Sequence, residues 1–410
     1  MNAGGPGVVV IGAGHAGGSA AAFLRQYGWK GPITLVGEEP VPPYQRPPLS
    51  KAWLKGEADA QSLALRPAGF YAEQRIELRL GRRVAAIDRA ARTVILDTGE
   101  ELSYDRLILA TGARPRRLDL PGGDLAGVLE LRGMAGADRL KAALRPGIRL
   151  AVIGGGYIGL EVAASARALG VEPVVVERES RLLPRVASPA LAAFIQDQHR
   201  ARGVVVELGA AVEALEGAAG RVTSLRLTDG RLIPCDVVLI GVGAVPNDEL
   251  ARRSGLDCAG GVVVDLAART GDPAIHAIGD CTIRPLPPHG RMGRLESVPN
   301  AVEQAKQAAA AICGRPPSAP EVPWFWSDQF ELRLQLAGLP FDAAEAVIRG
   351  DPGRPGFAVF HLDAEGVVQA VEAVNAAPEF MAGRMMIARR QRIARERLQD
   401  PTLSMRELAT

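Results

Sequence analysis

One glycine pattern occurs twice in the chain, and it constrains the fold more than any other feature. Val8 to Gly17 reads VVVIGAGHAG, and Leu150 to Gly159 reads LAVIGGGYIG. In both stretches an apolar run ends in glycines at G-x-G-x-x-G spacing, and residues typical of a helix follow. Strand, glycine turn and helix in this order predict a dinucleotide site, with the phosphates at the positive end of the helix dipole.

The three glycines of each copy have different tasks, and an acidic residue follows each copy. The first glycine permits a tight turn, the second lets a pyrophosphate approach bare backbone, and the third lets the helix pack close to the strand. A second strand-like run then ends in Glu38 or Glu177, where a carboxylate can bind the adenosine ribose. Glu177 favours a free 2'-hydroxyl, and therefore NADH over NADPH, although the neighbouring Arg178 weakens this inference. The glycines are Gly12, Gly14 and Gly17 in the first copy and Gly154, Gly156 and Gly159 in the second.

A second pair of similar stretches follows the glycine motifs. LDTGEELSYDRLILATGARP (Leu96 to Pro115) matches LTDGRLIPCDVVLIGVGAVP (Leu227 to Pro246) at an offset of 131 residues. Each predicts a hairpin turn that leads into a buried strand ending in Gly-Ala-x-Pro. A single glycine turn has a purely structural alternative, but two copies with matching downstream stretches are best explained by two dinucleotide-binding modules.

The first repeat holds extra residues, since its glycine motif lies 142 residues before the second one. We assign the surplus to Pro40 to Gly56, PVPPYQRPPLSKAWLKG, whose prolines predict that neither a regular helix nor a central strand forms. This segment is either a surface loop shaped by prolines or a rigid segment laid across the cofactor. In the second case Arg46 and Lys51 supply its charges.

The rest of the chain carries one further site candidate and a change of composition. The run IHAIGD predicts a strand whose Asp280 binds a polyol such as ribitol or, alternatively, caps a helix. Asn247 to Gly260 reads as irregular, and Val298 to Cys313 as a helix. Beyond the proline cluster at 316–323, WFWSDQF, alternating strands and one basic helix over Met381 to Leu398 predict a third domain without a nucleotide signature.

Composition excludes several classes of protein. The length of 410 residues predicts two or three domains, and a net charge of +2 argues against wholesale nucleic-acid binding. The longest apolar stretch, Leu150 to Ala166, is interrupted by glycines and Glu161, so no membrane span is expected. The N-terminus lacks the pattern of a signal peptide, and a cytoplasmic location is therefore expected. The four cysteines and five histidines are scattered, which predicts neither a redox-active cysteine pair nor a metal site.

Taken together, the motifs identify a family. Over essentially its full length the chain resembles the FAD-dependent NADH:ferredoxin reductases of bacterial oxygenase systems, the putidaredoxin reductase type, within the glutathione-reductase-like flavoprotein fold. The resemblance implies an α/β fold of two Rossmann-like domains and a C-terminal α+β domain. It divides the chain into an FAD-binding domain (1–115 and 247–322), an NAD-binding domain (116–246) and a C-terminal domain (323–410). The stretches that carry it are VVVIGAGHAG, PPYQRPPLSKAWL, LILATGARP, LAVIGGGYIGLE, GVGAVPN, IHAIGD, RLESVPNAVEQAK and PWFWSDQ.

The same resemblance implies cofactor contacts by position. FAD contacts are implied for Ala16, Glu38, Lys51, Val84, Arg132, Asp280 and Val298, and NAD contacts for Gly156, Ile158 and Glu177. The matching motifs add the glycines of each turn, with Arg46, Ala110, Thr111, Gly112 and Trp326 for FAD and Gly243 for NAD.

The implied mechanism is hydride transfer from nicotinamide C4 to flavin N5, followed by single-electron steps to a 2Fe-2S ferredoxin. That ferredoxin would feed a haem monooxygenase or a ring-hydroxylating dioxygenase. Lys51 is the candidate for positive charge near flavin N5, and Glu161 for pairing with it or orienting the carboxamide. An ordinary acid in the first helical turn is the alternative for Glu161. Trp326 lies either where electrons leave the flavin or in the core.

The partner and the competing functions follow from the same resemblance. Arg291, Arg294 and the C-terminal arginines are candidates to meet an acidic ferredoxin in a transient complex of a monomer or weak dimer. An NADH oxidase, a peroxide-reducing enzyme or a monodehydroascorbate-type reductase would use the same two sites. The peroxide and disulfide members need an active cysteine near the flavin, and Pro40 to Lys55 contains none. A flavoprotein of the apoptosis-inducing-factor type is the alternative from another class.

Overall fold

The computed structural model describes residues 6–409, which form two compact units, each built from three segments of the chain. The first unit comprises the described part of Met1–Arg46 together with Ala60–Arg114 and Val245–Pro323. The second comprises Pro47–Asp59, Pro115–Ala244 and the described part of Trp324–Thr410. Most of the proline-rich surplus of the first repeat therefore belongs to the second unit.

The first unit is built on a seven-stranded sheet with the order β3-β2-β1-β6-β5-β4, and β18 pairs with β6. The central strand β1 is fully buried, as its sequence GVVVI requires, and pairs in parallel with β2 and β6. The hairpin expected at Thr98-Gly99 joins β5 to β6 in antiparallel register. The strands are β1 (Gly7–Ile11), β2 (Ile33–Gly37), β3 (Ile76–Leu80), β4 (Val84–Asp88), β5 (Thr93–Leu96), β6 (Glu101–Leu109) and β18 (Ile275–Ala277).

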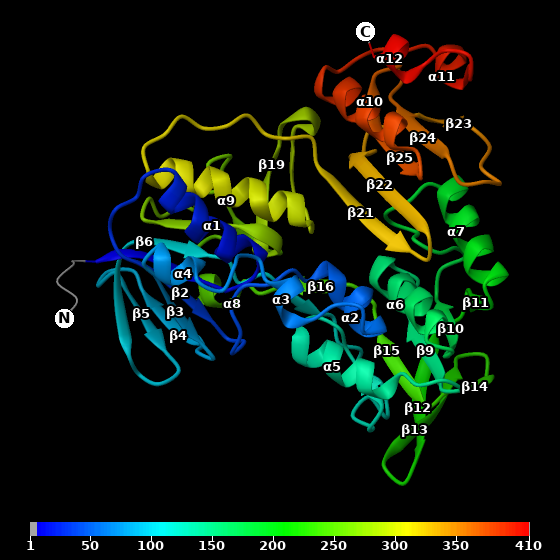
Figure 1. Ribbon diagram of the computed structural model, residues 1–410, viewed down its shortest axis with the longest axis horizontal. Coiled ribbons are helices and arrows are strands. Elements are labelled where there is room, and N and C mark those ends of the chain that lie inside the picture. The colour runs from blue at the N-terminus through cyan, green and yellow to red at the C-terminus, as the bar shows by residue number, and fades with distance from the viewer. Residues whose placement is uncertain (1–5, 410) are drawn as a thin grey trace. The chain divides into compact units, whose positions relative to one another are not determined.

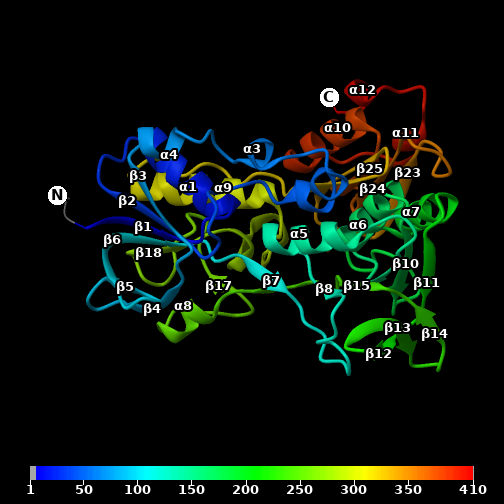
Figure 2. The ribbon, with the colours of Figure 1, turned by 60° about the horizontal axis from the view of Figure 1, so that its bottom comes forward.

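Two alanine-rich helices, α1 and α9, lie side by side against this sheet (Figures 1 and 2). Their facing alanines, among them Ala20, Ala305 and Ala309, are fully buried, and such small side chains allow close packing. The two helices are α1 (His15–Gln26) and α9 (Val298–Ile312). Short elements complete the unit, namely α3 (Ala60–Leu63), α4 (Phe70–Glu73), α8 (Glu249–Arg253), β17 (Val262–Val263), η2 (Gly279–Cys281), β19 (Thr282–Leu286), η3 (Pro287–His289) and β20 (Arg291–Gly293).

The second unit repeats the parallel sheet in the order β11-β10-β9-β15-β8. Helix α6 follows β9 and is buried along most of its length, so the second glycine motif lies on the same strand–turn–helix arrangement as the first. A three-stranded antiparallel sheet, β12-β13-β14, follows β11 in the chain. The elements are η1 (Pro47–Ser50), α2 (Ala52–Lys55), β8 (Val128–Leu129), α5 (Met134–Ala143), β9 (Arg149–Ile153), α6 (Tyr157–Ala168), β10 (Glu172–Glu177), α7 (Pro189–Ala201), β11 (Val205–Leu208), β12 (Val212–Ala218), β13 (Arg221–Leu227), β14 (Leu232–Pro234) and β15 (Val237–Ile240).

The C-terminal part of the second unit is an antiparallel sheet with the order β21-β22-β25-β24-β23, against which α10 packs (Figure 1). Leu334 and Phe357 of this sheet share one core with Leu160 of α6 and Leu54 of α2. Two short strands, β7 and β16, lie where the chain crosses between the units. The bounds are β7 (Ala113–Pro115), β16 (Ala244–Pro246), β21 (Trp324–Gln329), β22 (Leu332–Gly338), β23 (Glu345–Arg349), β24 (Phe357–Leu362), β25 (Val368–Val374), α10 (Ala377–Ala388), α11 (Arg395–Gln399) and α12 (Met405–Leu408).

The expected basic helix over Met381 to Leu398 was wrong. Helix α10 starts earlier, with a proline in its first turn, and ends at Ala388. Arg390 then adopts a positive φ of 51°, a conformation that ends a right-handed helix. The chain instead forms a bridge between Arg392 and Val367 before α11 begins.

Two expectations of irregular structure were also wrong. Helix α8 lies within Asn247 to Gly260, because Leu250 and Ala251 are buried and Arg252 bonds back to Asp248. Helix α2 lies within Pro40 to Gly56, because the last proline of that segment is Pro48 and nothing after it prevents a helical turn.

No helix among residues 6–409 is both long enough and apolar enough to cross a bilayer.

Candidate functional site: two dinucleotide turns and a buried lysine–glutamate pair

The first glycine turn has the geometry that its three glycines predict. Gly12 has φ 114°, and a Cβ there would lie 2.1 Å from the carbonyl oxygen of Ala110. A Cβ on Gly17 would lie 1.9 Å from the carbonyl oxygen of Gly12, so helix and strand are in direct contact. Gly14 differs, because a Cβ there would meet nothing within 4 Å. The backbone at Gly14 therefore faces open space into which a phosphate can approach.

The second turn repeats this arrangement. Gly154 has φ 105°, a Cβ on Gly159 would lie 2.5 Å from the carbonyl oxygen of Gly154, and Gly156 faces open space. Beside it Ile158 exposes 49% of its surface, although it lies on a helix that is otherwise largely buried. Gly243 also borders open space. This combination suits a nucleotide, because an exposed apolar side chain can pack against a ring face and bare backbone can approach the phosphates.

Glu177 is held in place by the second turn itself. Gly155 N–H donates to its Oε2 at 2.7 Å, and Glu179 N–H donates to its Oε1 at 3.0 Å. The carboxylate is 8% exposed, so its negative charge stays at the end of β10 in one orientation. Glu38 occupies the corresponding place after β2 and is exposed.

Several predicted FAD residues lie together in the first unit. Ala110 and Thr111 lie against Gly12. Thr111 and Gly112 bond to Asn247 through three contacts of 2.7–2.9 Å, which fixes the loop after β6. On another side, Ala16 lies against Gly279, the residue before Asp280.

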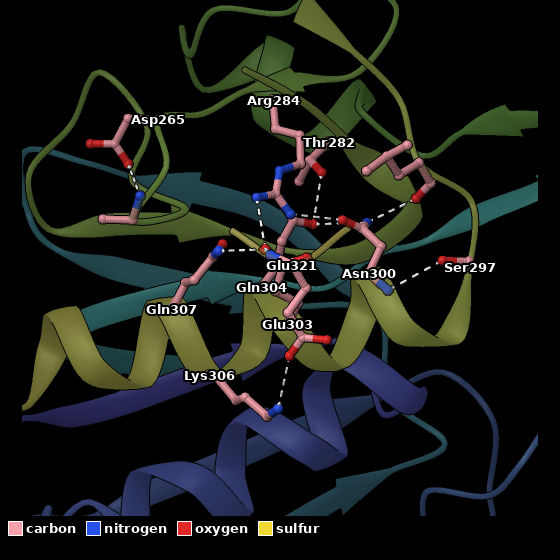
Figure 3. A network of polar contacts seen from close by, with 12 residues as sticks. Asp265, Thr282, Arg284, Ser297, Asn300, Glu303, Gln304, Lys306, Gln307 and Glu321 are labelled. Atoms are coloured by element: carbon pink, nitrogen blue, oxygen red, sulfur yellow. Dashed lines mark hydrogen bonds and ion pairs between the residues drawn. The ribbon is translucent and has the colours of Figure 1, made fainter. Parts of the chain in front are cut away.

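The turn that carries Asp280 is fixed by helix α9, whose Gln304 bonds to both Gly279 and Thr282. Figure 3 shows Gln304 on this helix with Thr282 and Arg284 beside it. Gln304 Oε1 accepts a hydrogen bond of 2.7 Å from Gly279 N–H and one of 3.0 Å from the Thr282 hydroxyl. Behind it Arg284 and Glu303, both buried, form a salt bridge of 3.1 Å. These polar residues were missed from the sequence, where Gln304 and Glu303 read only as parts of a helix.

Arg46 and Val84 occupy different surroundings from the rest of this set. Arg46 bonds Glu39 at 2.5 Å, and Tyr44 donates to the same carboxylate at 2.6 Å. Val84 is buried in a core of the first unit with Val36. Val298 is the first residue of α9, after the Ser297 N-cap. Their contacts with FAD stay predictions.

Lys51, Arg132 and Trp326, the remaining predicted FAD residues, belong to the second unit. Lys51 Nζ lies 2.7 Å from Glu161 Oε2 in a salt bridge whose side chains are 18% and 4% exposed. Trp326 is half-buried and lies 5.6 Å from Trp324 between ring centroids. Arg132 precedes α5 and is half-buried.

Glu161 is not an acid of the first helical turn, since α6 begins at Tyr157 and has no acidic residue in that turn. Pairing with Lys51 was one of the two expected arrangements, and the salt bridge is present. Two serines complete it. Ser50 Oγ donates to Glu161 Oε2 at 2.5 Å, and Ser327 Oγ donates to Oε1 at 2.7 Å. A buried ion pair needs such additional donors, because desolvation is costly.

The residues on either side of Lys51 are held by hydrogen bonds to side chains of α6 and α5. Ser165 Oγ donates to the carbonyl oxygen of Ser50 at 2.8 Å, and Lys51 Nζ donates to the carbonyl oxygen of Pro47 at 3.0 Å. Trp53 Nε1 donates to Asp138 at 2.8 Å. The segment from Pro47 to Gly56 therefore has a defined conformation, while its proposed position across the cofactor stays a prediction.

Both glycine turns therefore fit a bound dinucleotide, each with an open second glycine and an acidic residue at the end of the next strand. The described residues contain no group of three or more acidic, histidine or cysteine side chains able to hold a metal ion.

Comparisons with known proteins agree with this geometry. Residues 6–305 match the model of the pyridine nucleotide-disulphide oxidoreductases, and residues 324–409 match the reductase C-terminal domain. The chain belongs to this family of flavin-dependent oxidoreductases, whose cofactors are FAD and NAD(H). The family, the fold and the cofactors predicted from the sequence are confirmed.

Particular relatives are similar over nearly the whole chain. A probable ferredoxin reductase of Castellaniella defragrans is 53% identical over 98% of both chains. The ferredoxin–NAD(+) reductase component of the biphenyl dioxygenase system of Paraburkholderia xenovorans is 40% identical over 98% of both chains. The crystal structure of the covalent putidaredoxin reductase–putidaredoxin complex matches with a TM-score of 0.96 and 40% identity, covering 99% of this chain and 98% of the other.

Proposed function

We propose that this protein is an NADH:ferredoxin reductase that passes electrons from NADH through FAD, one at a time, to a 2Fe-2S ferredoxin serving an oxygenase. One observation carries the proposal: the chain has two glycine turns with open second glycines, one in each unit. A resident and a visiting dinucleotide can then be bound separately. The relatives named above include the reductase of a dioxygenase system and a reductase in a covalent complex with putidaredoxin.

The domain and residue assignments are part of this proposal. FAD is assigned to the turn at Gly12 to Gly17, with residues 1–115 and 247–322 as its domain. NADH is assigned to the turn at Gly154 to Gly159 within residues 116–246, and residues 323–410 form the third domain. When bound, FAD supplies the chemistry that accepts a hydride and releases electrons singly.

Two charged residues of the chain have proposed roles beside the bound cofactors, Lys51 for FAD and Glu177 for NADH. Lys51 holds a fixed positive charge, because Glu161 and the carbonyl oxygen of Pro47 keep its ammonium in place. Such a charge stabilises negative charge that develops on reduction. Glu177 presents a carboxylate where an adenosine ribose binds and favours NADH, since a 2'-phosphate would face like-charge repulsion.

Burial of the cysteine thiols disfavours disulfide and peroxide chemistry. Cys281, next to Asp280, is fully buried, and burial raises the pKa of its thiol. Burial also raises the pKa of Cys235 to about 11. A thiol that stays protonated is a poor nucleophile. All four cysteines are free, which is typical of a reducing compartment and supports a cytoplasmic location.

Stopped-flow mixing of the holoenzyme with NADH and NADPH, and then with purified 2Fe-2S ferredoxins, tests the proposal. We expect rapid cofactor reduction by NADH, slower reduction by NADPH and single-electron transfer to at least one ferredoxin. Rapid reduction by NADH without transfer to any 2Fe-2S protein would contradict the ferredoxin reductase assignment. A long-lived reduced complex with NAD would instead favour the apoptosis-inducing-factor type.

A further inference from the structure

A line of hydrogen bonds joins Glu161 to a histidine on another helix of the same unit. This line starts at Glu161 Oε1, whereas the salt bridge with Lys51 is made by Oε2. Ser327 Oγ lies 2.7 Å from Glu161 Oε1, and Gln329 Nε2 lies 3.1 Å from Ser327 Oγ. Gln329 Oε1 then lies 2.8 Å from His199 Nε2. Ser327 and Gln329 are on β21, and His199 is near the end of α7. All three are 0% exposed.

The charge of Glu161 determines the direction of every bond in this line. A carboxylate only accepts, so the single hydroxyl proton of Ser327 points to Glu161. Ser327 must then accept from the next residue, which requires the amide nitrogen of Gln329 on that side. The amide oxygen of Gln329 therefore faces His199, whose Nε2 must carry a proton.

We propose that Ser327, Gln329 and His199 are positioning residues for the carboxylate of Glu161. They hold its Oε1 edge, so that the Oε2 edge stays directed at Lys51. Hydrogen bonds aligned in one direction polarise one another, and each member then strengthens the bond that reaches the carboxylate.

The surroundings of His199 agree with this role. Burial lowers the pKa of His199 to about 4, so that the ring is neutral near pH 7 and carries one proton. Phe330 packs edge-on at 5.1 Å between ring centroids. Nδ1 has no hydrogen-bond partner among the described residues, whereas Nε2 lies next to Gln329 Oε1. A proton on Nε2 therefore forms a hydrogen bond, and a proton on Nδ1 would not.

The first experiment compares two buried serines in the holoenzyme. Ser327→Ala removes the donor to Glu161, and we expect the rate constant for cofactor reduction by NADH to fall about tenfold, the size of one hydrogen bond to a charged group. Ser188→Ala is the matched control. Ser188 is 5% exposed and caps α7 by accepting from Leu191 N–H at 3.2 Å, whereas the serines that donate to Glu161 are Ser50 and Ser327. We expect its reduction rate to stay within about twofold of the wild type.

The second experiment asks whether Ser327 acts through Glu161. In a Glu161→Gln background, Ser327→Ala should change the reduction rate less than about twofold, because the charge that it orients is gone. An equal loss in both backgrounds, or an equal loss for Ser327→Ala and Ser188→Ala, would overturn the proposal. Cofactor content and melting temperature, measured for every variant, show whether each one folds.

A third measurement does not depend on activity. ¹⁵N NMR of the holoenzyme should show His199 with the proton on Nε2, and Ser327→Ala should shift its ring resonances through Gln329, which bonds to both residues. A proton on Nδ1 in the wild type would refute the proposed line of bonds. The kinetic arm rests on the proposed function. If NADH reduced neither the wild type nor any variant, the proposed function would be refuted. The NMR result would still decide whether His199, Gln329 and Ser327 position Glu161.

Discussion

At the scale of single residues, Lys51 and Glu161 show how a buried charge is maintained. Neither residue is stable alone in this environment, because removing one partner leaves the other charge desolvated. Two serine hydroxyls and the Lys51 ammonium together satisfy the carboxylate. An arrangement with this many matched donors is costly to rearrange, which makes it a suitable support for the role that we propose for Lys51.

Replacing Lys51 tests this role. We expect Lys51→Ala to slow cofactor reduction by NADH at least tenfold and to destabilise the fold by about 3 kcal/mol, since Glu161 loses its counter-charge. Lys55→Ala is the control, because Lys55 lies nearby but pairs with the largely exposed Glu57, and an exposed pair contributes roughly 0–1 kcal/mol. Stopped-flow absorbance and thermal melting measure both effects. An unchanged reduction rate in Lys51→Ala would remove the residue from the mechanism.

Replacing Glu177 tests the preference for NADH. Glu177→Gln keeps a carbonyl oxygen for the N–H of Gly155 or Glu179 but removes the negative charge, so discrimination against a 2'-phosphate should fall. We expect the ratio of kcat/KM for NADH over NADPH to drop about tenfold, the effect of roughly 1.4 kcal/mol. Glu179→Gln, at a neighbouring exposed carboxylate, should leave the ratio unchanged. Steady-state kinetics with both nucleotides decide the matter.

At the scale of elements, two glycines of the second turn have different roles, since Gly156 borders open space and Gly159 packs against the strand. Gly156 has φ −84°, which any residue adopts, and a Cβ there meets nothing within 4 Å. Gly156→Ala should therefore fold and bind FAD normally, while its KM for NADH rises about tenfold because the methyl group occupies the place of the phosphates.

The matched variant is Gly159→Ala. Its Cβ would lie 2.5 Å from the carbonyl oxygen of Gly154, so helix and strand must separate. We expect a lower melting temperature in this variant and not in Gly156→Ala. Equal melting temperatures would contradict the different tasks assigned to the two glycines.

The strand, turn and helix of each glycine motif were predictable because an apolar run ends at a glycine and residues typical of a helix follow. The buried polar contacts were not. Ser327 and Gln329 occupy alternate positions of β21, and the inward polar face of WFWSDQ was the available signal. Their partners Glu161 and His199 lie more than 100 residues away, and only tertiary packing brings them together. The end of α10 was missed for a different reason, since a positive φ at an arginine has no sequence signature.

At the scale of the whole molecule, buried histidines couple stability to pH. Burial lowers the pKa of both His199 and His276 to about 4, from an ordinary value near 6.5. Between these values the unfolded chain binds protons that the native state does not, so stability is fully present above about pH 6.5 and is lost as the pH falls toward 4.

His276 gives the cleanest test, because neither ring nitrogen has a partner among the described residues. His276→Leu should abolish its share of the loss, roughly 3 kcal/mol between pH 8 and pH 4. Denaturant unfolding of wild type and variant at both pH values measures the difference. An identical pH dependence in the two proteins would show that His276 takes up its proton in the native state.

The division of each unit into three chain segments has a consequence for synthesis on the ribosome. Ser50 and Glu161 are 111 residues apart, and Glu161 and Ser327 a further 166. At about 5–20 residues per second, the nascent chain carries Glu161 for roughly 10–30 s before Ser327 is made. The second unit therefore cannot close its polar interior during translation until its final segment has emerged. A ribosome that stalls between Glu161 and Ser327 would leave a nascent chain with an incompletely satisfied acid in its core.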